Sequence, residues 1–233
     1  ADRLAQIQTS EEGRELIAQA SAAAGERSGV QIVTMQDALV NFVEEQSTKR
    51  KFISYGFSRL DGRLYSDYGD FVVLAGRPSA GKTAMALQMA VHMGRHDKVG
   101  FYSLETSPAK LTNRIIANRA IVDFGRINRR EMTQEEWERV VRLKGEIMES
   151  DVELIPASGW SVQDILSTAL QRRHKIIFID YLQQLTGRGK DRFEQVTRIS
   201  LDLHAMAQTH GILVVALSQL NRASTARPDA APT

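Results

Sequence analysis

The sequence contains no cysteine, which excludes disulfide bonds and any metal centre with cysteine ligands. This absence gives weak support to a reducing, cytoplasmic location. Aromatic residues make up only 6% of the 233 residues and do not interleave with basic ones. Trp137 and Trp160 are therefore expected to pack against apolar side chains rather than to stack on nucleobases.

Long apolar runs are also missing. The apolar stretches around Phe71 and Ile212 are far shorter than a membrane span, and the first residues, Ala-Asp-Arg-Leu, lack the basic and apolar regions of a signal peptide. We therefore expect a soluble protein with no membrane partner. The five histidines give no metal-binding pattern, because His92 and His96 lack an intervening glutamate and a third ligand. The formal net charge of +2 is compatible with a nucleic-acid partner without requiring one.

Residues 76–83, Gly-Arg-Pro-Ser-Ala-Gly-Lys-Thr, complete the phosphate-loop pattern G-x-x-x-x-G-K-[ST] without a mismatch. An apolar run with strand propensity precedes this loop at 71–75, and a buried-helix pattern follows at 84–91. These flanks favour a nucleotide site over a chance match in a glycine-rich loop. The predicted nucleotide-binding residues are Gly76, Arg77, Pro78, Ser79, Ala80, Gly81, Lys82, Thr83 and Ala84.

The residue types in the loop point to ATP and Mg²⁺ as cofactors. The two glycines at its ends let backbone N–H groups turn inward, toward an anion at the positive end of the following helix. Lys82 places a point charge on the β and γ phosphates, and the Thr83 hydroxyl can ligate the Mg²⁺ that bridges them.

The remaining chain reads as strands alternating with helices. Further strands are predicted at 98–104, 152–155, 176–179 and 212–217. Further helices are predicted at 10–24, at 34–46, from 108 through 121 and from 133 to about 148. Two more helices are predicted, one that begins at 161 and one that ends at about 210. Near-continuous apolar strands between helices predict a parallel α/β sheet covered on both faces. We expect three parts: an N-terminal helical extension at 1–50, a core at 51–222 and a loose tail at 223–233.

Three polar residues follow predicted strands, where ligands of an open parallel sheet bind. Asp180 ends an apolar strand in the manner of a Walker B acid that holds Mg²⁺. Glu105 could take a proton from water that attacks the γ phosphate, or be a surface glutamate in a turn. Gln219 could sense the γ phosphate, or be an ordinary loop side chain.

Four segments together resemble, in order and spacing, the motifs of DnaB-type replicative helicases. They are the phosphate loop, Phe-Tyr-Ser-Leu-Glu at 101–105, Ile-Asp-Tyr-Leu-Gln at 179–183 and Leu-Ser-Gln-Leu-Asn-Arg at 217–222. The segment 132–139 also resembles that family's inter-motif helix. The resemblance covers about residues 35–222 and is far more specific than any one motif.

This resemblance implies a RecA-like ATPase fold with the Gln219 strand between the phosphate-loop strand and the Asp180 strand. It implies that Glu105 activates water, that Thr83 and Asp180 serve the metal, and that Gln219 couples nucleotide state to DNA. The predicted catalytic residues are therefore Glu105, Lys82 and Gln219. The resemblance further implies a ring-shaped homohexamer that moves 5′ to 3′ on single-stranded DNA, with primase and a helicase loader as possible partners. The apolar face of the helix at 34–46 would then dock on a neighbouring subunit.

The sequence departs from the family where it ends, shortly after Arg222. The family's central DNA loop and basic finger come after this point, so neither is assigned here, and an incomplete or trimmed sequence is one interpretation. Arg188, Lys190 and Arg192 are candidate DNA contacts, although charges in loops are usually only solvated. A helicase paralogue or shortened form that binds nucleotide without unwinding is the alternative function. A recombinase-like or KaiC-like member of the fold is disfavoured by the residues around Glu105 and Gln219.

Overall fold

The structure is a computed structural model that describes residues 33–46 and 51–220. The chain divides into two units, Ala1–Lys51 and Phe52–Thr233. The helix predicted at 10–24 and the tail at 223–233 lie outside the described residues. Within these ranges, no helix has the length and apolar character needed to cross a bilayer.

The described part of the first unit is helix α3 (Met35–Gln46), as predicted. Thr34 begins it by accepting a hydrogen bond from the Asp37 backbone N–H at 3.2 Å, a typical N-terminal cap. Its apolar side chains are exposed within this unit, namely Met35, Leu39, Val40, Phe42 and Val43.

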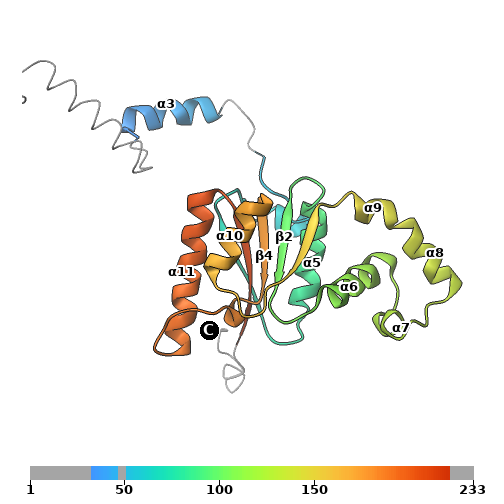
Figure 1. The fold of residues 1–233 in the computed structure, drawn as a ribbon. Helices are drawn as coiled ribbons and strands as arrows, with labels where there is room; N and C mark the ends of the chain where they lie inside the picture. The colour runs from blue at the N-terminus through green and yellow to red at the C-terminus, as the bar shows by residue number, and fades with distance from the viewer. Residues whose placement is uncertain (1–32, 47–50, 221–233) are drawn as a thin grey trace, which may run out of the picture. The chain divides into compact units, whose positions relative to one another are not determined.

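The second unit is built on a five-stranded sheet in which every strand pair is parallel (Figure 1). Its order is β1-β5-β4-β2-β3. The strands are β1 (Phe71–Gly76), β2 (Val99–Ser103), β3 (Val152–Pro156), β4 (Ile176–Asp180) and β5 (Leu213–Gln219). All five strands were predicted, and the placement of the Gln219 strand β5 between β1 and β4 is confirmed.

Helices cover both faces of this sheet (Figure 1). On one face α5 (Lys82–Met93) and α6 (Pro108–Ala120) pack on alternate strand residues, including Phe101, Phe178 and Val215. On the other face α10 (Val162–Arg172) and α11 (Arg192–His210) pack on the intervening residues, including Tyr102, Ile179 and Val214. Because successive strand side chains point to opposite faces, continuous apolar strands supply both cores at once.

The other helical segments of this unit are short. They are α4 (Ser58–Asp61), α7 (Phe124–Arg129), α8 (Gln134–Arg142), α9 (Lys144–Met148) and the 3₁₀ helix η1 (Leu182–Gln184).

The helix predicted from Thr133 to Met148 is interrupted. Its beginning is a capping box, in which Thr133 and Glu136 exchange side-chain to backbone bonds at 3.3 and 2.8 Å. Helix α8 ends before Leu143, where the backbone ψ angle is −10°, and α9 begins one residue later. Gly145 follows at once, and glycine weakens a helix interior, so the periodic pattern alone overestimates the length of this helix.

Candidate functional site

The phosphate loop connects the end of β1 to the first turn of α5, as its sequence predicted. Gly81 stands just before the helix with a φ of 88°, a left-handed conformation that glycine adopts without a Cβ penalty. Ser79 is also left-handed, at φ 61°. The loop therefore leads into the N-terminus of a 12-residue helix, whose free N–H groups and dipole favour an anion.

The Lys82 side chain lies back across this loop. Its Nζ donates to the carbonyl oxygens of Gly76 at 2.8 Å and Arg77 at 2.9 Å. A Cβ at Gly76 would lie only 3.3 Å from Lys82 Cγ, so glycine keeps this path open. Two neutral carbonyl oxygens thus hold the ammonium at the loop. A phosphate oxygen would compete favourably with them for the ammonium, because it carries a negative charge.

Thr83 and Asp180 are brought together from the start of α5 and the end of β4. Thr83 Oγ1 donates to Asp180 Oδ2 at 2.9 Å. Burial raises the pKa of Asp180 and the negative charge of Glu105 adds to this, whereas the Thr83 bond and the charges of Arg114 and Lys82 oppose it. Asp180 is 6% exposed, so its charge is sensitive to every neighbour.

This pair of oxygens fits the requirements of Mg²⁺, which takes one or two protein ligands and leaves its other positions to water and phosphate oxygens. Among the described residues, no group of three or more His, Cys, Asp or Glu side chains forms a metal site. A Mg²⁺ held by these two oxygens would take its remaining ligands from water or phosphate oxygens.

Most of the predicted nucleotide-site residues line one cavity of about 450 Å³ at the carboxyl ends of the strands. Its lining comprises Pro78, Ser79, Gly81, Lys82, Thr83, Ala84, Glu105, Thr106, Arg114, Asp180, Tyr181 and Gln219. Glu105 follows β2 and Gln219 ends β5, so sheet topology brings both to the same edge as the phosphate loop. Gly76, Arg77 and Ala80 belong to the loop without lining the cavity.

Arg114 is the charged lining residue that sequence reasoning missed. It lies in the second turn of α6, and its positive charge lowers the pKa of Asp180. The cavity thus holds two cationic side chains, Lys82 and Arg114, with two carboxylates, Asp180 and Glu105. No local sequence signal marks an arginine inside a helix as part of a site, because only the packing of α6 beside α5 brings it there.

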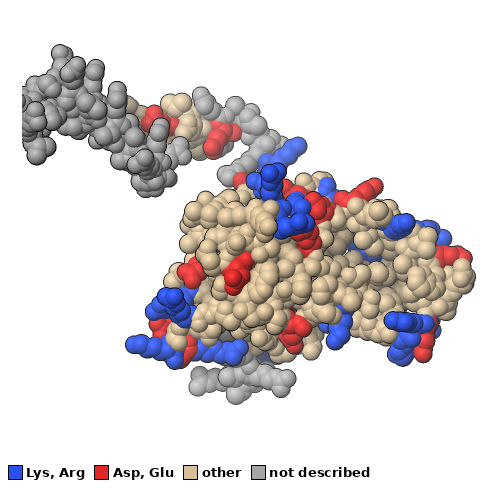
Figure 2. All heavy atoms as spheres, in the orientation of Figure 1, with Lys and Arg blue, Asp and Glu red and all other residues tan. Residues whose placement is uncertain are grey.

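The structure places the predicted DNA contacts elsewhere. Arg188 lines a separate cavity of about 660 Å³, bounded mainly by α10 and α11. Lys190 and Arg192 are exposed at the start of α11, where Figure 2 shows blue side chains gathered at the surface. None of the three lines the nucleotide cavity.

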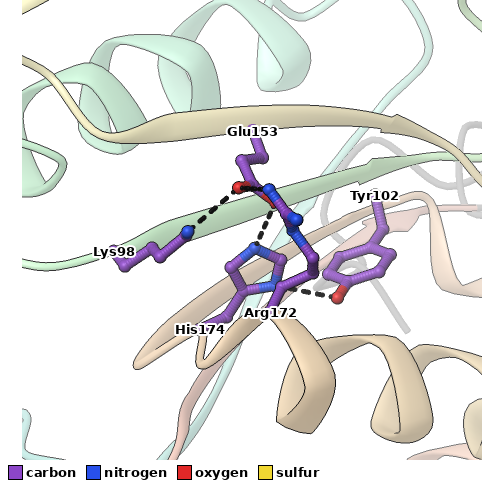
Figure 3. A network of polar contacts seen from close by, with 5 residues as sticks. All are labelled: Lys98, Tyr102, Glu153, Arg172 and His174. Carbon is purple, nitrogen blue, oxygen red and sulfur yellow. Dashed lines mark hydrogen bonds and ion pairs between the residues drawn. The ribbon is translucent and has the colours of Figure 1, made fainter.

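A second polar network crosses β2, β3 and the end of α10 (Figure 3). The buried His174 contacts Glu153 through Nε2 and the Tyr102 hydroxyl through Nδ1, both at 3.0 Å. Glu153 also pairs with Arg172 and, at 3.1 Å, with Lys98. The bonds to Arg172 in particular lower the pKa of Glu153 to about 2.

An ionised Glu153 can only accept, so Nε2 of His174 carries the proton and Nδ1 accepts from Tyr102. Burial lowers the pKa of His174, although Glu153 opposes this shift. The effect of burial on this pKa outweighs that of the ion pair, because the side chain of His174 is fully buried. The network ties the edge strand β3 to its neighbours and contributes no residue to the nucleotide cavity.

Comparison with known proteins agrees with these observations. The family model described as "DnaB-like helicase C terminal domain" matches residues 53–233. The replicative DNA helicase DnaB of Rickettsia typhi is 32% identical over 199 residues, which cover 77% of this chain and 40% of that protein. The chain therefore spans well under half the length of this relative.

Two solved structures share the fold. One, described as "The Structure Of A DnaB-Like Replicative Helicase And Its Interactions With Primase", has a TM-score of 0.76 and 32% identity, covering 90% of this chain and 54% of that one. The other is a solved ATPase domain with a TM-score of 0.77 and 34% identity, covering 85% of this chain and 75% of that one.

Proposed function

The chain belongs to the DnaB-like helicase C-terminal domain family, a family of P-loop ATPases and DNA helicases, and we propose that it is the ATP-hydrolysing motor domain of a replicative DNA helicase. The observation that carries this proposal is the meeting of Lys82, Thr83, Glu105, Asp180 and Gln219 around one cavity. They come from three strand ends and one helix N-terminus, and only the folded sheet unites them.

ATP is the proposed nucleotide, with its phosphates on the loop and the N-terminus of α5. Lys82 neutralises charge on the β and γ phosphates, and its present bonds to Gly76 and Arg77 hold it in reach of them. Thr83 and Asp180 would hold Mg²⁺, which would help to neutralise the charge that develops on the phosphates.

Glu105 is the proposed general base, which accepts a proton from the attacking water. It lines the same cavity as the phosphate loop and comes from β2, a strand separated from β1 by β4 and β5. Gln219 is proposed to contact the γ phosphate through its side-chain amide, and so to register whether ATP or ADP is bound.

The working assembly is proposed to be a ring-shaped homohexamer that moves 5′ to 3′ on single-stranded DNA. The exposed apolar side chains of α3 support a helix that docks on another subunit. Arg188, Lys190 and Arg192 are proposed DNA contacts, and primase and a loader are proposed partners. The solved DnaB-like replicative helicase, a relative of this chain, is itself described with its interactions with primase. A cytoplasmic location also remains a prediction.

The test compares ATP hydrolysis with and without single-stranded DNA, alongside solution mass. A hexamer whose turnover rises with DNA supports the motor. An unresponsive monomer that binds ATP supports the alternative, a nucleotide-dependent binding module that does not unwind.

Two variants test the assigned chemistry. Lys82→Ala should abolish nucleotide binding or hydrolysis. Glu105→Gln should bind ATP normally but lose about 100-fold or more in kcat, the range for a general base. Glu135→Gln, an exposed glutamate at the start of α8, is the matched control. Normal turnover in Glu105→Gln would remove Glu105 from the mechanism.

A further inference from the structure

In the part of the chain that the structure describes, the last residues of β5 lack a strand partner on one side. Pairing of β5 with β1 continues to the end, with Gly76 opposite Gln219. Pairing with β4 in the described sheet ends earlier, at Ile179 opposite Ala216. The chain then leaves β4 after Asp180, whose carbonyl bonds to Leu104 on the other side at 2.9 Å.

Gln219 nevertheless has both backbone groups paired on that side. Its N–H donates to Oε1 of Gln183 at 3.3 Å, and its carbonyl accepts from Nε2 of Gln183 at 3.2 Å. The same Nε2 donates to the Ser218 hydroxyl at 2.8 Å. The side-chain amide of Gln183 thus forms hydrogen bonds with both the N–H and the carbonyl of Gln219. A neighbouring strand would bond to these two backbone groups in the same way.

The orientation of the Gln183 amide follows from these partners. The Gln219 N–H needs an acceptor and the Gln219 carbonyl needs a donor, so oxygen and nitrogen have only one satisfactory assignment. On the opposite edge, the Leu220 N–H donates to the Gly76 carbonyl at 3.2 Å. The end of β5 is therefore held between the phosphate loop and Gln183.

The backbone that carries Gln183 is anchored in the core. It lies in the middle of η1, between Leu182 and Leu185, which are both 2% exposed in the core. The neighbouring Gln184 is exposed and bonds instead to the Tyr181 hydroxyl at 2.6 Å. Only one of these two adjacent glutamines is directed at β5.

We propose that Gln183 is a positioning residue for Gln219: its amide replaces the missing strand and fixes the end of β5, so that the Gln219 side chain stays in the nucleotide cavity. The inference rests on the proposed role of Gln219 in ATP hydrolysis. Gln183 does not line the cavity, so it acts through Gln219 rather than on the nucleotide.

The first test is kinetic. In the intact protein, Gln183→Glu keeps the shape but loses both N–H donors, and Gln183→Ala removes the group. Each should lower kcat about tenfold or more while KM for ATP stays within about threefold, because small displacements of a catalytic contact cost rate more than binding. Gln184→Ala is the matched control. Normal kcat in both Gln183 variants would overturn the proposal.

A double-mutant cycle separates positioning from general loss of structure. If Gln183 acts through Gln219, the Gln183→Ala/Gln219→Ala pair should lose no more kcat than Gln219→Ala alone. Fully additive losses would overturn the proposal. Binding of a fluorescent ADP analogue at the wild-type level would show that each variant keeps its phosphate loop.

Hydrogen exchange gives a readout that does not need catalysis. The Gln219 amide should exchange faster in Gln183→Ala and stay protected in Gln184→Ala, and unchanged protection in both would overturn the proposal. If the wild-type protein hydrolyses no ATP, the proposed function fails while this measurement still tests the geometry. If the wild type is active and the Gln183 variants match it, this inference alone fails.

Discussion

The Thr83 hydroxyl donates a hydrogen bond of 2.9 Å to Oδ2 of Asp180, joining residues 97 positions apart. The bond links the helix that follows the phosphate loop to the end of the central strand β4. It places the two proposed metal ligands side by side, on a helix and a strand that are both packed in the core.

The first prediction concerns this pair. Thr83→Val keeps the shape of the side chain but removes the oxygen, so it should weaken Mg²⁺-dependent ATP binding by about tenfold, typical of a lost bond to a charged group. Thr83→Ser retains the hydroxyl and should bind normally. Titration of a fluorescent ATP analogue with and without Mg²⁺ measures the difference. Equal Mg²⁺ dependence in the valine variant and the wild type would exclude Thr83 as a ligand.

The second prediction concerns Arg114, whose charge lowers the pKa of Asp180. Arg114→Gln removes that charge, so the Asp180 pKa should rise further and Mg²⁺-dependent binding should weaken, most visibly as the pH falls. The measurement is the Mg²⁺ titration repeated at several pH values. Lys110→Gln removes an exposed cation from the same helix without touching the cavity, and serves as the control. Identical pH profiles for Arg114→Gln and the control would contradict the assignment.

The sheet and most of the site could be predicted because their signals are local. A continuous apolar run followed by a polar residue marks both a buried strand and its functional end, which is how Asp180 and Gln219 were found. Glu105 follows the same rule, and the phosphate loop is marked by its own G-x-x-x-x-G-K-[ST] pattern. The confirmed placement of β5 between β1 and β4, by contrast, came from resemblance to a family, since no local pattern specifies which parallel strands become neighbours.

The features that the sequence did not predict depend on where helices and strands end and on which of them pack together. Arg114 enters the cavity only because α6 lies beside α5. The Gln183 bonds to Gln219 exist only because β4 stops pairing before β5 does. The break at Leu143 interrupts a region whose polar and apolar periodicity continues through it. The positions of Arg114 and Gln183 depend on contacts between residues that are distant in sequence. The break at Leu143 depends on a local change in the backbone angles.

The third prediction concerns the buried His174, whose pKa is lowered from 6.5 by burial. Below pH 6.5 the unfolded state takes up protons that the folded state resists, so the free energy of unfolding should fall as the pH falls through this range, by at most about 1.4 kcal/mol per pH unit. His174→Gln should show a shallower dependence between pH 6.5 and 5. Urea unfolding at fixed pH values measures the slope. The Glu153 contribution is lost separately, between pH 4.5 and about 2.

The fourth prediction concerns Gly100, which makes room for the same network. A Cβ at this position would lie 2.5 Å from His174 Nδ1 and 2.8 Å from Tyr102 Cε2. Because both rings are buried and hydrogen-bonded to each other, neither can move away without losing a bond. Gly100→Ala should therefore lower the free energy of unfolding by about 1–3 kcal/mol, the usual cost of overpacking.

Gly145 is the matched control for this substitution. It lies in α9, and a Cβ there would meet no atom of the described residues within 4 Å. Gly145→Ala should leave stability unchanged or raise it by about 0.5–1 kcal/mol, because alanine favours the helix and glycine does not. Urea unfolding of both variants at pH 7.5 gives the comparison. Equal stability of Gly100→Ala and the wild type would mean that the rings of Tyr102 and His174 can repack, and that the network does not hold β3 in the way its geometry indicates.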